Sequence, residues 1–100
     1  MKKAFGVYIL QSLKNSRYYI GSTDDMNRRL TQHNKGYVKS TENMRPWKLK
    51  AFVKKETLQE ARKAELRLKR YKSRVILEKV ISDGVLPWDF KNELKSPKPR

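Results

Sequence analysis

The chain has 100 residues, 37% of them hydrophobic, and a formal net charge of +15. This length allows one domain with a modest core, and the charge favours a nucleic-acid partner over a basic protein without one. The sequence has no cysteine and a single histidine, which excludes disulfides, a thiolate nucleophile and a zinc site made of Cys or several His residues.

The amino-terminal stretch MKKAFGVYILQS places lysines before a short apolar run, as a signal peptide does. The run ends in Gln11-Ser12 and no small-residue cleavage pattern follows it. No stretch of the sequence approaches the length needed to span a membrane. We therefore expect a cytoplasmic protein that does not bind membranes.

The first elements are predicted to form a hairpin. Phe5–Leu10 and Tyr18–Ile20 are rich in β-formers, and the polar QSLKNSR between them suits a loop. Because alternate residues of a strand share a face, a turn with a two-residue centre would place Tyr8 and Tyr19 side by side. Gly21 would then leave space beside a tyrosine for another group to approach. The alternative is a pair of tyrosines that only pack in a half-buried sheet.

A helix is predicted from Asp24 to Lys35. Thr23 or Asp24 would cap its N-terminus, and Gly36 stands where a C-terminal cap belongs. The stretch GYVKSTENMRP after this helix reads as a polar loop.

The third strand is predicted from Lys48 to Lys55, where Leu49, Ala51 and Val53 alternate with lysines. Phe52 breaks this alternation, which indicates that both faces of the strand are partly covered.

Two further helices are predicted to follow. The first begins at Thr57, which has the spacing of a capping box with Glu60, and apolar residues recur along it as far as Tyr71. The second covers Ser73–Ser82 and ends at Asp83-Gly84. The order of elements indicates an α+β domain over residues 1–83 with a small antiparallel sheet. Residues 84–100 form a basic tail that we expect to dock through Trp88 and Phe90.

Arg29, His33 and Glu65 fall on the sides of the predicted helices that carry apolar residues. A buried carboxylate such as that of Glu65 is costly unless it is paired or binds a metal. Each residue also has a purely structural explanation. The guanidinium of Arg29 would reach water, His33 would have its hydrogen bonds satisfied at a domain edge, and Glu65 would form an ion pair with a lysine or arginine.

Together these residues resemble the GIY-YIG nuclease superfamily, most of all its small single-domain branch, which is similar to the nuclease domain of the UvrC excision-repair subunit. The resemblance covers roughly Ala4 to Ile81. It rests on GVY at Gly6–Tyr8, with Val7 in place of isoleucine, YIG at Tyr19–Gly21, Arg29 and His33 in RRLTQH, the GYVKST loop, Pro46, and Glu65 in EARKAELRLK. The asparagine that some members carry after the glutamate helix is absent from the corresponding SRVILEKVI.

The resemblance implies a three-stranded sheet flanked by helices and metal-dependent cleavage of a phosphodiester bond. It implies Tyr8 as general base, Tyr19 as a hydrogen-bond partner at the same centre, Arg29 as holder of the scissile phosphate, His33 as an aid in positioning or proton transfer, and Glu65 as ligand of one divalent ion. A lone carboxylate with waters and phosphate oxygens suits Mg²⁺, with Mn²⁺ as the other candidate. Tyrosine is a poor base at its ordinary pKa of about 10, and nearby cations such as Arg29 and the metal would favour its phenolate.

Further residues are expected to shape or contact the bound nucleic acid, for which DNA is favoured over RNA. The family glycine Gly6 would shape the surface. The weaker candidates for contact are Gly21, Ser22, Thr23, Lys35, Lys39 and Lys48.

Three functions remain open on the sequence alone. The leading one is an endonuclease that is weakly specific or selects substrates by structure in repair, with specificity from the domain, from substrate shape or from a protein partner. The second is a nucleic-acid-binding module of the same fold that does not cleave, and the third is a basic structural protein of the nucleoid or ribosome. A metal-ligating glutamate beside the tyrosines and arginine favours the enzyme, because a protein that only binds has no need of it.

Overall fold

The computed structural model describes residues 4–89 of the chain. Its elements, in chain order, are β1 (Phe5–Ser12), β2 (Tyr18–Thr23), α1 (Met26–Asn34), the short 3₁₀ helix η1 (Lys39–Met44), β3 (Trp47–Lys55), α2 (Leu58–Arg70) and α3 (Arg74–Asp83). The strands form one three-stranded antiparallel sheet in the order β2-β1-β3. The α+β class expected from the sequence is therefore confirmed.

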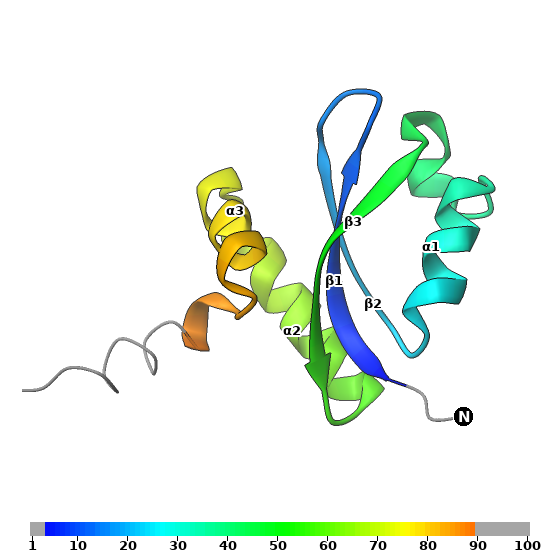
Figure 1. The fold of residues 1–100 in the computed structure, drawn as a ribbon. Coiled ribbons are helices and arrows are strands. Elements are labelled where there is room, and N and C mark those ends of the chain that lie inside the picture. The colour runs from blue at the N-terminus through cyan, green and yellow to red at the C-terminus, as the bar shows by residue number, and fades with distance from the viewer. Residues whose placement is uncertain (1–3, 90–100) are drawn as a thin grey trace, which may run out of the picture.

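The helices cover the two faces of the sheet separately (Figure 1). The α1 face carries a core of Tyr8, Leu10 and Trp47, to which Leu30 of α1 adds. The opposite face packs under α2 and α3, and its core is made of Val7, Ile9, Ala64, Leu68, Val80 and Leu86. Successive β1 side chains point to opposite faces, so this central strand is buried on both sides.

The β1–β2 hairpin is joined by residues 13–17 rather than by a tight two-residue turn. The register nevertheless pairs Tyr8 with Gly21 and Leu10 with Tyr19. Residues that pair directly in an antiparallel sheet lie on the same face. The prediction that Tyr8 and Tyr19 share a face is confirmed.

The alternation expected for β3 is interrupted at Lys50. Ile9 pairs with Ala51 and Leu10 with Leu49, so Lys50 is the extra residue of a bulge. The bulge turns Leu49 to the α1 face, while Ala51 stays on the other face. The expectation that Leu49 and Ala51 share one face was wrong.

The helix caps agree with the sequence in α2 but not in α1. Thr57 accepts a hydrogen bond from the Glu60 backbone N–H and caps α2, as expected. In α1 the cap is Asp25, which accepts from the Arg28 backbone, so the assignment to Thr23 or Asp24 was wrong. The Thr23 hydroxyl instead bonds the Asp25 backbone and closes the turn before the helix.

The segment expected to be a polar loop contains η1, and it is anchored to the sheet. The indole N–H of Trp47 donates to the Thr41 carbonyl, and the hydroxyl of Ser12 donates to the Met44 carbonyl. Thr41 has no exposed surface. These bonds hold η1 beside the end of α1, where it can support groups that α1 presents.

After α3 the chain returns to the core of the α2–α3 face. Gly84 ends α3 in the left-handed conformation, with φ of 77°, and Leu86 is fully buried. Trp88 packs against this core, whereas Phe90 lies outside the described residues. Among the helices of residues 4–89, none is long and apolar enough to cross a membrane.

Candidate functional site

The hydroxyl of Tyr8 lies at the centre of a buried hydrogen-bond network. It is 2.8 Å from Nε2 of His33 and accepts a hydrogen bond from Nε of Arg29 at 3.3 Å. Arg29 and His33 are one turn apart on α1, so this helix brings both to the tyrosine. Tyr8 is 1% exposed and His33 0%, which places the centre of the site beneath the surface.

Gly21 makes room for the Tyr8 ring itself. A Cβ atom at position 21 would lie 2.5 Å from Cζ of Tyr8 and even closer to its hydroxyl oxygen. The expected space beside the tyrosine for another group is therefore filled by that tyrosine. The Tyr8 ring therefore packs directly over the backbone of Gly21 in the edge strand β2.

Tyr19 joins the network through its ring. The centroid of the ring lies 5.1 Å from that of His33 in an edge contact, and 6.3 Å from that of Tyr8. On its other side, Trp47 lies 6.1 Å away. Tyr19 thus fixes the orientation of the imidazole by packing.

Thr41 completes the network, and its contacts favour the tautomer of His33 that carries the proton on Nδ1. Its Oγ1 lies 2.8 Å from Nδ1 of His33 and donates to the carbonyl of Val38 at 3.3 Å. Because a hydroxyl has one hydrogen, Oγ1 accepts from Nδ1–H, and Nε2 is free to accept from Tyr8. With the other tautomer, the Tyr8 hydroxyl would lack an acceptor among residues 4–89. Sequence reasoning gave Thr41 no role of its own, although it ends the GYVKST loop, because one threonine in a polar loop carries no sign of burial.

Burial controls the protonation of both partners. It raises the pKa of Tyr8 to about 12, although the hydrogen bond and charge of Arg29 act to lower it. Burial and the Arg29 charge together lower the pKa of His33 to about 4. At neutral pH the pair is therefore a neutral phenol that donates to a neutral imidazole. Arg29 does favour the phenolate, as expected, but desolvation outweighs its effect on the pKa of Tyr8.

Glu65 approaches the same part of β2 from the opposite face of the sheet. Its Oε1 accepts from the hydroxyl of Ser22 at 2.6 Å, and Oε2 pairs with Nζ of Lys69 at 2.7 Å. Ser22 follows Gly21 directly and points to the α2 side. The Glu65 charge is also among the causes that raise the pKa of Tyr8. Positions 21 and 22 of the edge strand are thus where the two halves of the site meet.

The Glu65 carboxylate fits a divalent cation as a single protein ligand. Its side chain is 18% exposed, whereas its partner Lys69 is 45% exposed, so the ammonium end of the ion pair reaches solvent and can move aside for a cation. Ser22 occupies one lone pair of Oε1 and leaves another free. Within residues 4–89 no group of three or more His, Asp or Glu is gathered, so water and phosphate oxygens would supply the remaining ligands. That donor set suits Mg²⁺ or Mn²⁺.

The weaker nucleic-acid candidates are distributed over different surroundings. Ser22 is engaged with Glu65, and Thr23 is buried at 4% exposure with its hydroxyl in the turn before α1. Lys35, Lys39 and Lys48 are exposed. The lysines remain available to a backbone phosphate, whereas the two hydroxyls have structural partners.

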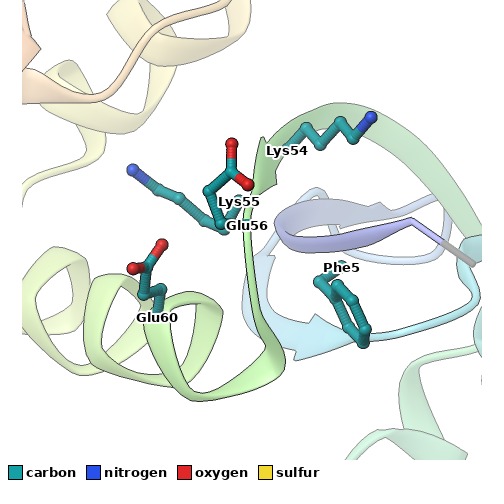
Figure 2. A pocket seen from close by; sticks show the side chains of 5 residues that line it. All are labelled: Phe5, Lys54, Lys55, Glu56 and Glu60. Atoms are coloured by element: carbon teal, nitrogen blue, oxygen red, sulfur yellow. The ribbon is translucent and has the colours of Figure 1, made fainter.

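A separate hollow of about 550 Å³ lies between the end of β3 and the start of α2 (Figure 2). Its lining residues are Phe5, Lys54, Lys55, Glu56 and Glu60. None of the residues of the Tyr8 network lines it, and its mixed charges do not favour one ligand class. The chemistry of the molecule therefore gathers at the edge of β2 and not in this hollow.

Comparison with known proteins gives a consistent result. Residues 4–78 match the model of the GIY-YIG catalytic domain. The chain is 52% identical over 52 residues to the structure-specific endonuclease subunit slx1 of Talaromyces stipitatus, which covers 46% of this chain and 13% of that protein. It is 45% identical over 64 residues to UPF0213 protein lwe0147 of Listeria welshimeri, which covers 63% of this chain and 70% of that protein. No solved structure matches the chain.

The family match includes both strands that carry the tyrosines, the helix that carries Arg29 and His33, and the helix that carries Glu65. It covers three quarters of the chain. The chain belongs to the GIY-YIG family.

Proposed function

We propose that this protein is a metal-dependent endonuclease that hydrolyses phosphodiester bonds in nucleic acid, with DNA as the favoured substrate. One arrangement carries the proposal. Arg29 and His33 both hydrogen-bond the Tyr8 hydroxyl, and Glu65 bonds Ser22, the next residue after the Gly21 that the Tyr8 ring contacts. A general base, a phosphate-binding cation and a metal-binding carboxylate are the groups that this hydrolysis requires.

The proton of the attacking water would pass through Tyr8 to His33. Tyr8 donates its hydrogen to Nε2 of the neutral imidazole, so its oxygen can take a proton from water as its own moves to the ring. The product is an imidazolium whose Nδ1–H still bonds Thr41. The relay forms an imidazolium in place of a free phenolate, and because burial and the Arg29 charge also disfavour the imidazolium, it depends on the phosphate that offsets the Arg29 charge.

Arg29 would bind the scissile phosphate and stabilise its developing charge. Its guanidinium is half-buried and bonds Gln32 through Nη1 at 3.0 Å as well as Tyr8. A phosphate is a stronger partner for a guanidinium than these neutral groups are. Exchange of the long Tyr8 bond for a phosphate contact would uncover the phenol oxygen for water.

Glu65 would hold a divalent cation, Mg²⁺ or Mn²⁺, at the α2 side of the β2 edge. When bound, such a cation offsets negative charge on the phosphoryl and leaving oxygens. Ser22 would orient the carboxylate through its hydrogen bond to Oε1. Lys69 would neutralise the carboxylate in the absence of the ion.

The substrate is proposed to be recognised by structure more than by sequence. The segment from Arg45 to Lys79 carries thirteen Lys or Arg and four acids, a charge that follows a phosphate backbone without reading bases. The similar fungal proteins are named structure-specific endonuclease subunits. By this analogy a protein partner of our chain would add specificity, and a role in repair is part of the proposal.

The test is cleavage of matched branched, nicked, single-stranded and duplex substrates, with and without Mg²⁺ or Mn²⁺. We expect metal-dependent cleavage, most of all of a substrate with a junction between duplex and single strand. Tight binding of these substrates without cleavage in either metal would instead support the non-catalytic binding module. Binding should weaken with salt at a log–log slope of about 0.9 for each phosphate neutralised, and a flat dependence would contradict nucleic acid as the partner.

A further inference from the structure

Three side chains form an aromatic–cation cluster at the C-terminal end of α2, away from the Tyr8 network. The guanidinium carbon of Arg67 lies 4.2 Å from the centroid of the Trp88 ring. The ring of Tyr71, directly after α2, is nearly parallel to that of Trp88, with centroids 6.5 Å apart and an angle of 11° between the planes. We call Arg67, Tyr71 and Trp88 the Trp88 platform.

The platform is open to solvent at two places. Tyr71 is 41% exposed. A hollow of about 300 Å³ lies beside it, lined by Arg67, Arg70 and Tyr71. A second hollow of about 200 Å³ reaches Trp88 and is lined by Lys55, Glu60, Lys63, Ala64, Arg67 and Trp88. A tryptophan that served the core alone would not need an exposed, parallel tyrosine and an arginine beside it.

The charge around the platform selects an anionic partner. Lys55, Lys63, Arg67 and Arg70 line the two hollows, against Glu60 as the acid. Figure 2 shows the side chain of Lys55 extending above α2 on the side of Glu60, whereas Lys54 points away. Flat rings together with cations are the combination that stacks bases and holds their phosphates.

The platform and Glu65 lie on different sides of one helix. Glu65 faces Ser22 of β2, and Arg67, two residues later, is about 200° further around the helix. The surface of α2 between them carries the exposed cations Arg62, Lys69 and Arg70. A strand that leaves the Glu65 site would cross a basic surface before it reaches Trp88.

We propose that the Trp88 platform binds unpaired bases of a nucleic-acid strand whose backbone crosses α2. The inference rests on the proposed function, because it assumes that the bound strand runs from the cleavage site to the platform. Bases in a duplex are already stacked on their neighbours, so a protein ring can stack only on a base that is unpaired. The platform therefore selects substrates with a single-stranded arm.

The experiment compares Tyr71→Leu with Tyr71→Phe, both in the full chain, on a fluorescent single-stranded oligonucleotide and on a blunt duplex of the same length. Loss of stacking should weaken single-strand binding about five- to 150-fold, with little change for the duplex and little effect of Tyr71→Phe. Arg67→Lys, which keeps the charge but loses the planar group, should weaken it as well. Leu13→Ala, in the loop between β1 and β2 and 63% exposed, is the control, because it lies outside α2.

Tryptophan fluorescence reports on stacking independently of cleavage. The chain has two tryptophans, and Trp47 is buried at 3% exposure, so quenching by an oligonucleotide should come from Trp88 and should disappear in Trp88→Leu. Equal losses for single strand and duplex in Tyr71→Leu would overturn the platform and leave the nuclease proposal intact. The platform would also be overturned if the protein self-associated and Tyr71→Leu abolished that self-association without changing oligonucleotide binding. Absence of cleavage with normal quenching would overturn the nuclease proposal alone.

Discussion

Tyr8 and His33 form a donor–acceptor pair in which the phenol oxygen and Nε2 lie 2.8 Å apart and neither residue is more than 1% exposed. Burial raises the pKa of the phenol to about 12 and lowers that of the imidazole to about 4. Both groups are therefore neutral at pH 7, and the Nδ1–H tautomer of His33 that Thr41 favours makes the phenol the donor. A proton can move from Tyr8 to His33 only when another charge arrives, which in our proposal is the phosphate bound by Arg29.

Tyr8→Phe should abolish cleavage and leave binding intact. The change removes the hydroxyl that would take the water proton and keeps the ring that crosses Gly21. A general base contributes about 10² to 10⁴ in rate, so we expect a loss of at least about a hundredfold in single-turnover cleavage. Tyr18→Phe is the control, because Tyr18 lies on the neighbouring strand β2 and its hydroxyl bonds the exposed Glu78. Equal rates for Tyr8→Phe and the control would exclude Tyr8 as the base.

Thr41→Val should disturb the tautomer of His33. The valine keeps the shape of threonine but cannot accept from Nδ1–H, and a buried donor without a partner costs about 1–3 kcal/mol. His33 is the only histidine of the chain, so the ¹⁵N signals of one imidazole report the tautomer directly. We expect a single Nδ1–H form in the wild type, a mixture in Thr41→Val, and recovery in Thr41→Ser. An Nε2–H form in the wild type would contradict the proton direction from Tyr8 to His33.

The buried imidazole should make the protein less stable in mild acid. The unfolded chain binds a proton near pH 6.5 that the folded chain binds only near pH 4, so the free energy of unfolding falls as the pH falls through this window. Between pH 7 and pH 5 the loss should be about 2 kcal/mol. Urea unfolding at several pH values measures it, and His33→Gln should flatten the dependence. A wild-type stability that is constant from pH 7 to pH 5 would show that His33 is not held neutral.

Much of this arrangement could be predicted from the sequence, because it depends on local periodicity. Strand alternation placed Tyr8 and Tyr19 on one face, and the helical repeat placed Arg29 and His33 on the side of α1 that meets them. The placement of Arg29 and His33 is a property of one helix, whereas the shared face of Tyr8 and Tyr19 also depends on the hairpin register, which the loop of residues 13–17 preserves without the expected two-residue turn.

What could not be predicted depends on contacts between distant segments. The bulge at Lys50 arises from the pairing of β3 with β1, and the buried position of Thr41 depends on a bond from Trp47 to its carbonyl. The pKa values of Tyr8 and His33 follow from burial in the assembled core, whereas the sequence shows only the cation beside them. The helical repeat placed Glu65 toward the sheet, but its meeting with Ser22 required the register of β2 against α2.

Glu65→Gln should separate a metal ligand from a structural ion pair. The amide keeps the length of the side chain and can still accept from Ser22, but it loses the charge that would bind a divalent ion. We expect metal-dependent cleavage to fall by two or more orders of magnitude, about 1.4 kcal/mol of barrier for each tenfold. Nucleic-acid affinity should hold or rise, because an acid has left a basic surface.

Glu78→Gln is the matched control for this change, because Glu78 is also a helical glutamate with a basic partner four residues away, Arg74 at 3.1 Å, and is 51% exposed. If Glu65 serves only the pair with Lys69, the two variants should behave alike, with a small shift of the melting temperature and unchanged cleavage. A second measurement keeps the result independent of folding, namely the Mg²⁺ concentration that gives half-maximal cleavage. That concentration should rise in Glu65→Gln and stay constant in Glu78→Gln. A folded Glu65→Gln variant with wild-type rates and wild-type metal dependence would remove Glu65 from the site.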